Sequence, residues 1–309
     1  MYSWGADTDD WAKPGAYSFD SARKAAMDKD AKAAAAKGGR TYLNRSAPEA
    51  SLVDPRGKRI SSQSENPVLV AVDVTGSMAH WPGEIFDRLP LLYQTLSQYR
   101  PDVELAFCAI GDATSDRYPL QVADFGAGAE LDQRLAGIYG EGGGGGGARE
   151  SYELFAYYVQ EQVSTPRAEK PFLILYGDEG FYPEVHAGQV KHYLGLDLPK
   201  QEKVVSADVW RRLGERFEIY LLRKTYGGSQ EQEILAQWQE VIEPQKILTI
   251  DHEQRAVDLA LGLIARSWGR FDDFQVNMAA RQPEAVVKAL AHSLDARSHK
   301  ASRKSRSSA

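Results

Sequence analysis

The stretch spanning residues 67–78 constrains the fold more than any other part of the chain. Residues 68–72 are apolar without alternation, which is typical of a strand that is buried on both faces of a parallel sheet. This run ends in Asp73, and the hydroxyl residues Thr75 and Ser77 follow in the next few positions. Ligands bind at the carboxyl ends of strands in open α/β sheets, and oxygen side chains suit Mg²⁺. The pattern therefore predicts a metal site at the end of a buried strand.

The sequence after this stretch alternates between strand and helix signals, as a doubly wound sheet requires. A second apolar strand, at 171–178, ends in Asp178, so another carboxylate is expected at the same sheet edge. The remaining strands are predicted at 103–110, 121–125 (a short edge strand), 217–222 and 246–250. Helices are predicted at 82–99, with a kink at Pro90, and at 129–139, 149–163 and 253–268.

The run Asp73-x-Thr75-x-Ser77 resembles the DxSxS motif that opens the metal-ion-dependent adhesion site (MIDAS) of von Willebrand factor A (vWA, integrin I-domain-like) domains. The order and spacing of the later strands agree with that family, and Asp178 matches its last metal-linked position. The resemblance, to vWA proteins of the intracellular bacterial type, implies a doubly wound, mostly parallel six-stranded sheet. Its expected strand order is 3-2-1-4-5-6, with the third strand antiparallel and helices on both faces.

The chain departs from the family pattern at the middle metal ligand, which is usually a Thr in a glycine-containing loop. Here residues 142–147 are all glycine, and no Thr follows them before the next helix. Glu150 or Ser151 would then have to substitute for that Thr. If Glu150 binds the metal directly, its carboxylate fills the position that a partner's acid takes in many family members, and the site is closed at rest.

Several of these features also have structural interpretations. A DxTxS run occurs in ordinary strand-to-turn transitions with a capping hydroxyl, and a glycine run can be a flexible linker. Asp112 and Asp116 are expected at the same sheet edge as second-shell or second-metal residues, or else as solvated turn carboxylates. Ser151 and Glu179 complete the candidate second shell.

Composition limits the classes of function. The chain has 309 residues, 43% of them hydrophobic, and the 37 Lys and Arg against 43 Asp and Glu give a net charge of −6. That balance argues against nucleic acid as a partner of the whole chain. The single cysteine, Cys108, lies in an apolar run and is expected to be a buried core thiol. With no apolar stretch of membrane-spanning length and no signal-peptide pattern, a cytoplasmic protein without a membrane partner is expected.

Three unequal parts are predicted along the chain. Residues 1–65 form a polar, Ala-rich arm and linker, residues 66–273 form the vWA-like domain, and residues 274–309 form a short helix and a basic tail. The tail is disordered by composition, and nucleic acid is expected to bind, if at all, only through it.

The resemblance implies a metal-dependent protein-binding module, an adaptor or scaffold, in which a partner's acidic side chain completes the coordination of Mg²⁺. Mn²⁺ and Ca²⁺ are the alternative ions. Thr75 and Ser77 would bind the metal directly, while Asp73 and Asp178 would act partly through waters. Intracellular relatives often couple an AAA+ ATPase of the MoxR type to its targets, which makes such an ATPase a candidate partner.

Two other functions remain open at this point. The basic tail and the arm could serve as the scaffold of an RNA-associated assembly. The acidic residues could instead hold Mg²⁺ in a hydrolase and activate water. No catalytic residue is assigned, because His80, His186 and His192 do not stand in a recognisable acid/base motif, and Thr75 replaces the second carboxylate of phosphotransfer sites. Catalysis is therefore not the expected function.

Overall fold

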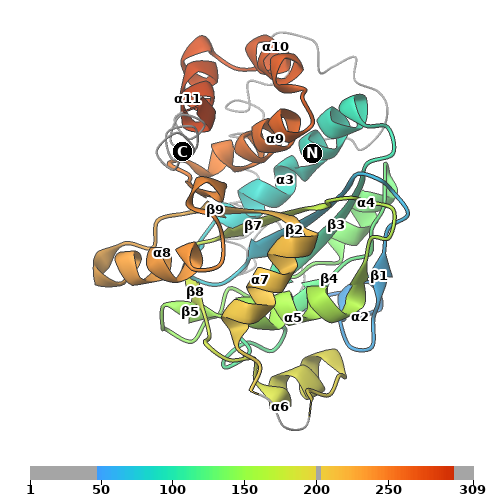
Figure 1. The fold of residues 1–309 in the computed structure, drawn as a ribbon, viewed down its shortest axis with the longest axis vertical. Coiled ribbons are helices and arrows are strands. Elements are labelled where there is room, and N and C mark those ends of the chain that lie inside the picture. Colours follow the sequence, from blue (N-terminus) through green and yellow to red (C-terminus); the bar gives the residue numbers. More distant parts are fainter. Residues whose placement is uncertain (1–46, 200–202, 296–309) are drawn as a thin grey trace, which may run out of the picture.

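A six-stranded sheet forms the centre of the computed structural model, which describes residues 47–199 and 203–295 (Figure 1). The strand order across the sheet is β10-β9-β7-β2-β3-β4. The neighbouring strands pair in parallel, except that β4 runs antiparallel to β3, so the sheet is mixed. Numbered along the chain, this is the expected order 3-2-1-4-5-6 with the third strand antiparallel. The strands are β2 (Pro67–Asp73), β3 (Glu104–Ile110), β4 (Leu120–Val122), β7 (Phe172–Gly177), β9 (Glu218–Arg223) and β10 (Ile247–Thr249).

Both faces of the sheet are covered, which explains the uninterrupted apolar run of β2. Successive side chains of a strand point to opposite faces. Val70 and Val72 belong to a core that includes residues of the helices α3 and α9, whereas Leu69 and Ala71 belong to a second core with residues of α5 and α7. The bounds of these helices are α3 (Trp81–Tyr99), α5 (Tyr152–Gln162), α7 (Ser206–Arg216) and α9 (Ala256–Ser267).

Shorter elements surround this framework, and the most important of them is a two-stranded parallel pair beside the site. There β5 (Arg149–Glu150) pairs with β8 (Gly180–Phe181), which brings Glu150 next to the residues that follow β7. The sequence pattern predicts a helix from residue 149, but α5 begins at Tyr152, because this pairing with a distant segment extends the backbone first.

The other elements lie around the periphery. They are β1 (Ile60–Ser61), β6 (Val163–Ser164), α2 (Ala50–Val53), α4 (Glu130–Ala136), α6 (Ala187–Gln189), a π-helical turn (Val190–Leu194), α8 (Glu231–Gln239), α10 (Phe271–Arg281), α11 (Glu284–Asp295) and short 3₁₀ turns at Gly228–Gln230, Pro244–Lys246 and Glu253–Arg255.

Contacts with the main domain continue on both sides of the predicted boundaries. Before residue 65, Val53 and Ile60 are buried and β1 pairs in parallel with β6. After residue 273, Phe274 and Met278 of α10 join the core that includes α9. Most of the predicted arm (1–46) and the basic tail (296–309) lie outside the described residues. None of the described helices combines the length and apolar character needed to cross a membrane.

Candidate metal site

Four oxygen-bearing side chains meet where β2 and β7, neighbours in the sheet, reach their carboxyl ends. Asp73 is the last residue of β2, Thr75 and Ser77 lie in the loop that follows, and Asp178 comes directly after β7. The Thr75 hydroxyl donates to Asp73 Oδ1 (2.6 Å) and lies 3.1 Å from Ser77 Oγ, which donates to Asp178 Oδ1 (2.9 Å). We call these four residues the strand-end cluster. The structure therefore brings together four of the five predicted metal ligands.

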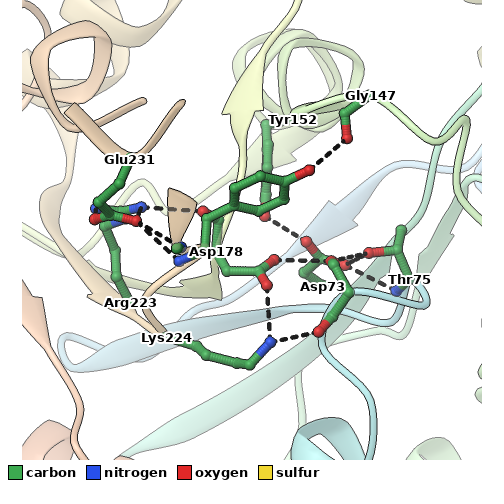
Figure 2. A network of polar contacts seen from close by, with 11 residues as sticks. Asp73, Thr75, Gly147, Tyr152, Asp178, Arg223, Lys224 and Glu231 are labelled. Atoms are coloured by element: carbon green, nitrogen blue, oxygen red, sulfur yellow. Dashed lines mark hydrogen bonds and ion pairs between the residues drawn. The ribbon is translucent and has the colours of Figure 1, made fainter. Parts of the chain in front are cut away.

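The second carboxylate oxygen of Asp73 accepts a hydrogen bond from a residue of α5. Tyr152 Oη donates to Asp73 Oδ2 at 2.5 Å, and both side chains are fully buried (Figure 2). A Cβ at Gly177 would lie only 2.0 Å from this hydroxyl, so the last residue of β7 must be glycine for the contact to form. The sequence analysis predicts a helix over 149–163 but does not identify the role of the Tyr152 hydroxyl.

A lysine that the sequence analysis did not single out reaches the same cluster. Lys224 immediately follows β9, the strand next to β7, and its ammonium lies 3.1 Å from Asp178 Oδ2 (Figure 2). The same ammonium also donates to the carbonyl oxygen of Ser77. A basic residue that directly follows a buried strand is the signal that could have identified it, because parallel strands end at one edge.

Burial shifts the acidity of the cluster. It raises the pKa of Asp73 to about 7, and the neighbouring Asp178 carboxylate adds to this rise. Burial also raises the pKa of Asp178, whereas the ammonium of Lys224 opposes that rise. One ammonium therefore offsets the mutual repulsion of two carboxylates that are almost wholly removed from water.

The fifth predicted ligand, Glu150, pairs with another glutamate instead. Glu150 and Glu179 hydrogen-bond to each other, and we call them the glutamate pair. Each keeps one buried carboxyl oxygen, Oε2, that has no hydrogen-bond partner among the described residues. Burial and this hydrogen bond raise the pKa of Glu150 to about 11, and burial raises the pKa of Glu179 to about 7. The raised pKa values indicate that the glutamate pair retains a proton near neutral pH.

The glycine loop at 142–147 contacts both the glutamate pair and the strand-end cluster. A Cβ at Gly144 would lie 3.0 Å from Glu150 Oε1 and 3.6 Å from the Cβ of Thr75, so Gly144 sits between these two side chains. The carbonyl of Gly143 accepts from the amide of Gly76 at 2.6 Å. Gly144 has φ +123°, a conformation that favours glycine. The loop therefore lies against the site, and its path requires glycine.

The predicted second-shell aspartates support the loops around the site. Asp112 accepts hydrogen bonds from the amide and hydroxyl of Thr114 and from the hydroxyl of Tyr182. Asp116 accepts from the amides of Asp112 and Gly144, at 2.8 and 2.9 Å. Both aspartates are buried, so they are not the solvated turn carboxylates of the alternative interpretation.

Ser151, which is also predicted near the site, contacts the segment that begins at Asp112. Its Oγ accepts from the amide of Ala113 at 2.8 Å and lies 3.4 Å from Asp112 Oδ1. Glu179 is held through its backbone, because the indole of the fully buried Trp238 donates to its carbonyl oxygen at 2.8 Å. That indole also packs edge-on against the ring of Tyr152, with ring centroids 5.4 Å apart.

The donor set suits a hard cation, because carboxylate and hydroxyl oxygens are the ligands that Mg²⁺ and Ca²⁺ prefer. Among the described residues, no three His, Cys, Asp or Glu side chains are grouped so as to hold a metal ion. An ion at the strand-end cluster would therefore depend on the hydroxyls of Thr75 and Ser77 as well as on its two carboxylates. In the glutamate pair, two buried carboxyl oxygens have no hydrogen-bond partner among the described residues. This indicates that the region around the site lacks positive charge.

Two solved structures resemble this fold weakly. No protein-family model matches the sequence, and no curated protein matches it. The pilus adhesin SpaC from Lactobacillus rhamnosus GG is similar with a TM-score of 0.45 and 11% identity, over 69% of this chain and 32% of that one. Proximal thread matrix protein 1 of the mussel byssus is similar with a TM-score of 0.46 and 10% identity, over 69% of this chain and 49% of that one. The chain spans less than half of either protein, and at these TM-scores neither likeness carries an argument about function.

Proposed function

We propose that this protein binds a divalent metal ion, Mg²⁺ in the first place, at the strand-end cluster, and that it uses the ion to bind an acidic side chain of a protein partner. The observation that carries the proposal is the continuous chain of hydrogen bonds from Asp73 through Thr75 and Ser77 to Asp178, with oxygen separations of 2.6 to 3.1 Å. Side chains this close already face one another and could turn their oxygens to a common ion.

The likeness to vWA domains supports the same proposal. The DxTxS run, the carboxylate after β7 and the strand order 3-2-1-4-5-6 occur together in this chain. In the vWA site the hydroxyls bind the metal directly and the carboxylates act partly through waters, which would be the roles of Thr75 and Ser77 against Asp73 and Asp178. The bound ion would supply positive charge for a carboxylate that approaches from outside.

The expected partner is therefore a protein that presents an exposed Asp or Glu. A MoxR-type AAA+ ATPase is the class of partner that intracellular vWA proteins favour, and we retain it as the first candidate. The chemistry of the site requires only the carboxylate, so the acid is the feature to test.

The first experiment measures metal binding through thermal stability. A ligand that binds only the native state raises its melting temperature. We expect the melting temperature to rise when Mg²⁺, Mn²⁺ or Ca²⁺ replaces EDTA, and we expect no rise in Asp73→Ala. Asp197→Ala is the matched control, because that carboxylate is exposed and paired with Lys191 away from the site. A rise that persists in Asp73→Ala would place the ion elsewhere, and no rise with any ion would refute the proposal.

The second experiment tests the partner's acid. Proteins captured by the wild-type chain in Mg²⁺ are compared with those captured in EDTA and by Asp73→Ala. For a partner that is captured only in the first condition, replacing the contacting Asp or Glu by its amide should abolish capture. Capture that survives every such replacement would contradict the acidic contact and leave metal binding itself intact.

A further inference from the structure

The ammonium of Lys224 is a positive charge that already binds a carboxylate of the strand-end cluster. It contacts Asp178 Oδ2 at 3.1 Å and the carbonyl oxygen of Ser77, and both are oxygen atoms of residues in the proposed metal site. Asp178 is 1% exposed, so water can do little to solvate its charge. The lysine thus supplies the positive charge that this carboxylate would otherwise lack.

The backbone that carries Lys224 is fixed at both ends. Residues 224–228, which we call the strap, begin after Arg223, whose buried guanidinium binds Glu231 at 2.7 Å and donates to the carbonyl of Asp178 at 3.0 Å. The amide of Tyr226 donates to Glu231 at 2.9 Å, and its hydroxyl donates to the carbonyl of Gly147 at 3.2 Å. The strap thus begins at the end of β9, and its Tyr226 reaches the glycine loop.

The Lys224 side chain is freer than its backbone. It is 26% exposed, and its four-carbon stem can turn the ammonium toward solvent without moving the strap. Two positive charges about 3 to 4 Å apart repel strongly at a site largely shielded from water. An ion that uses Asp178 therefore requires the ammonium to move away.

We propose that Lys224 is a built-in competitor of the metal ion: in the metal-free protein its ammonium takes the cation's place at Asp178 and Ser77, and metal binding must displace it. This inference rests on the proposed function and deepens it, because it names the residue that sets metal affinity. Lys224 keeps the empty cluster neutralised and makes the site respond only to ion concentrations that can overcome the internal ion pair.

The test is isothermal titration of EDTA-treated protein with Mg²⁺, for the wild type, Lys224→Met and Lys191→Met. Methionine keeps most of the length of the stem and removes the charge, and Lys191 is an exposed lysine paired with Asp197. We expect Lys224→Met to bind Mg²⁺ about tenfold more tightly than the wild type, because a partly buried ion pair no longer has to be broken. Lys191→Met should bind like the wild type, and adding Asp73→Ala to Lys224→Met should abolish binding.

The outcomes separate this inference from the proposed function. Equal or weaker affinity in Lys224→Met, with Asp73-dependent binding in the wild type, would overturn the competitor role and leave the metal site standing. If neither protein binds Mg²⁺, the proposed function fails and the competitor role fails with it.

A second measurement on the wild type covers the case in which Lys224→Met does not fold. Reductive methylation followed by mass spectrometry reports how exposed each lysine amine is. Saturating Mg²⁺ should increase the labelling of Lys224 and leave that of Lys191 unchanged. Labelling of Lys224 that Mg²⁺ does not increase would overturn the inference.

Discussion

The strand-end cluster and the glutamate pair are two neighbouring groups of buried acidic residues. Both keep carboxyl groups away from water, but different contacts stabilise those carboxyl groups. In the strand-end cluster, hydroxyls and the ammonium of Lys224 satisfy two aspartates. In the glutamate pair no cation makes contact within the described residues, so one carboxyl keeps a proton and two oxygens stay unpartnered. A buried carboxylate persists as an anion only where donors or cations meet it. The comparison indicates that an ammonium and hydroxyl donors stabilise the first region, whereas the second relies on a retained proton.

The largest effect is predicted for a substitution that displaces Tyr152, the residue that donates a hydrogen bond to Asp73 in the strand-end cluster. Gly177→Ala places a Cβ 2.0 Å from the hydroxyl of Tyr152, so the ring must move and Asp73 loses a donor. We expect the free energy of unfolding, measured in urea, to fall by about 3 kcal/mol from overpacking and the lost hydrogen bond. Gly214→Ala is the control, because its Cβ meets nothing within 4 Å in the helix α7. A Gly177→Ala protein as stable as the control variant would show that the contact is not needed.

A smaller effect is predicted when only the hydroxyl is removed. Tyr152→Phe preserves the ring and leaves Asp73 Oδ2 without its 2.5 Å donor. The free energy of unfolding should fall by about 2 kcal/mol, the usual cost of an unsatisfied buried polar group. Tyr157→Phe, on the same helix, should change it little, because its hydroxyl has no hydrogen-bond partner among the described residues. Similar losses in both variants would mean that the Asp73 contact contributes nothing particular.

The glutamate pair is predicted to differ through pH. The folded-state pKa of Glu150, about 11, lies above its ordinary value of 4.5, so the native protein holds a proton that the unfolded chain releases between these values. Stability therefore falls as pH rises through this range, by at most about 1.4 kcal/mol per pH unit for one proton. Glu150→Gln has no such proton, and its stability should fall less steeply between about pH 5 and pH 9.

The control for that prediction is Glu161→Gln, an exposed glutamate on α5. It should keep the pH dependence of the wild type, since its carboxyl is solvated in both states. Parallel pH profiles for Glu150→Gln and the wild type would show that the pair is ionised and would remove the contrast between the two regions.

The smallest effect is predicted at Asp112, whose carboxylate accepts hydrogen bonds from several donors. Asp112 accepts from Thr114 through both amide and hydroxyl and also from Tyr182. Thr114→Ala removes one of these donors at an exposed position, so the free energy of unfolding should fall by only about 0.5 kcal/mol. A loss as large as that of Tyr152→Phe would show that the number of donors does not determine how a buried carboxylate responds.

The sequence predicts the strand-end cluster well because its chemistry is local to the strand ends. Asp73 and Asp178 each terminate an apolar run, and parallel strands that are neighbours in a sheet end at one edge. The apolar run around Cys108 predicts its burial in β3, whereas the strand order is implied by the resemblance to vWA domains. Metal binding itself, the partner and the vWA assignment stay predictions.

Other parts of the site depend on contacts between distant segments, which local patterns do not encode. Glu150 was expected beside the metal, yet the parallel pairing of β5 with β8 places it against Glu179. The hydroxyl of Tyr152 sits on a helix whose pattern predicts only a buried ring. Lys224 approaches from β9, the neighbour of β7 in the sheet. Its place directly after a buried strand predicts the edge on which it lies, but not whether its ammonium turns inward or to solvent.

The position of Trp238 gives the protein an optical reporter of its own. Its indole donates a hydrogen bond to the carbonyl oxygen of Glu179 and packs against the ring of Tyr152. One chromophore therefore contacts a residue of the glutamate pair and the tyrosine that binds Asp73. Ion entry, loss of the Glu150 proton or displacement of the lysine would each alter the electric field at that indole and hence its emission. The difference in fluorescence between the wild type and Trp238→Phe would follow these events in real time, without an attached dye.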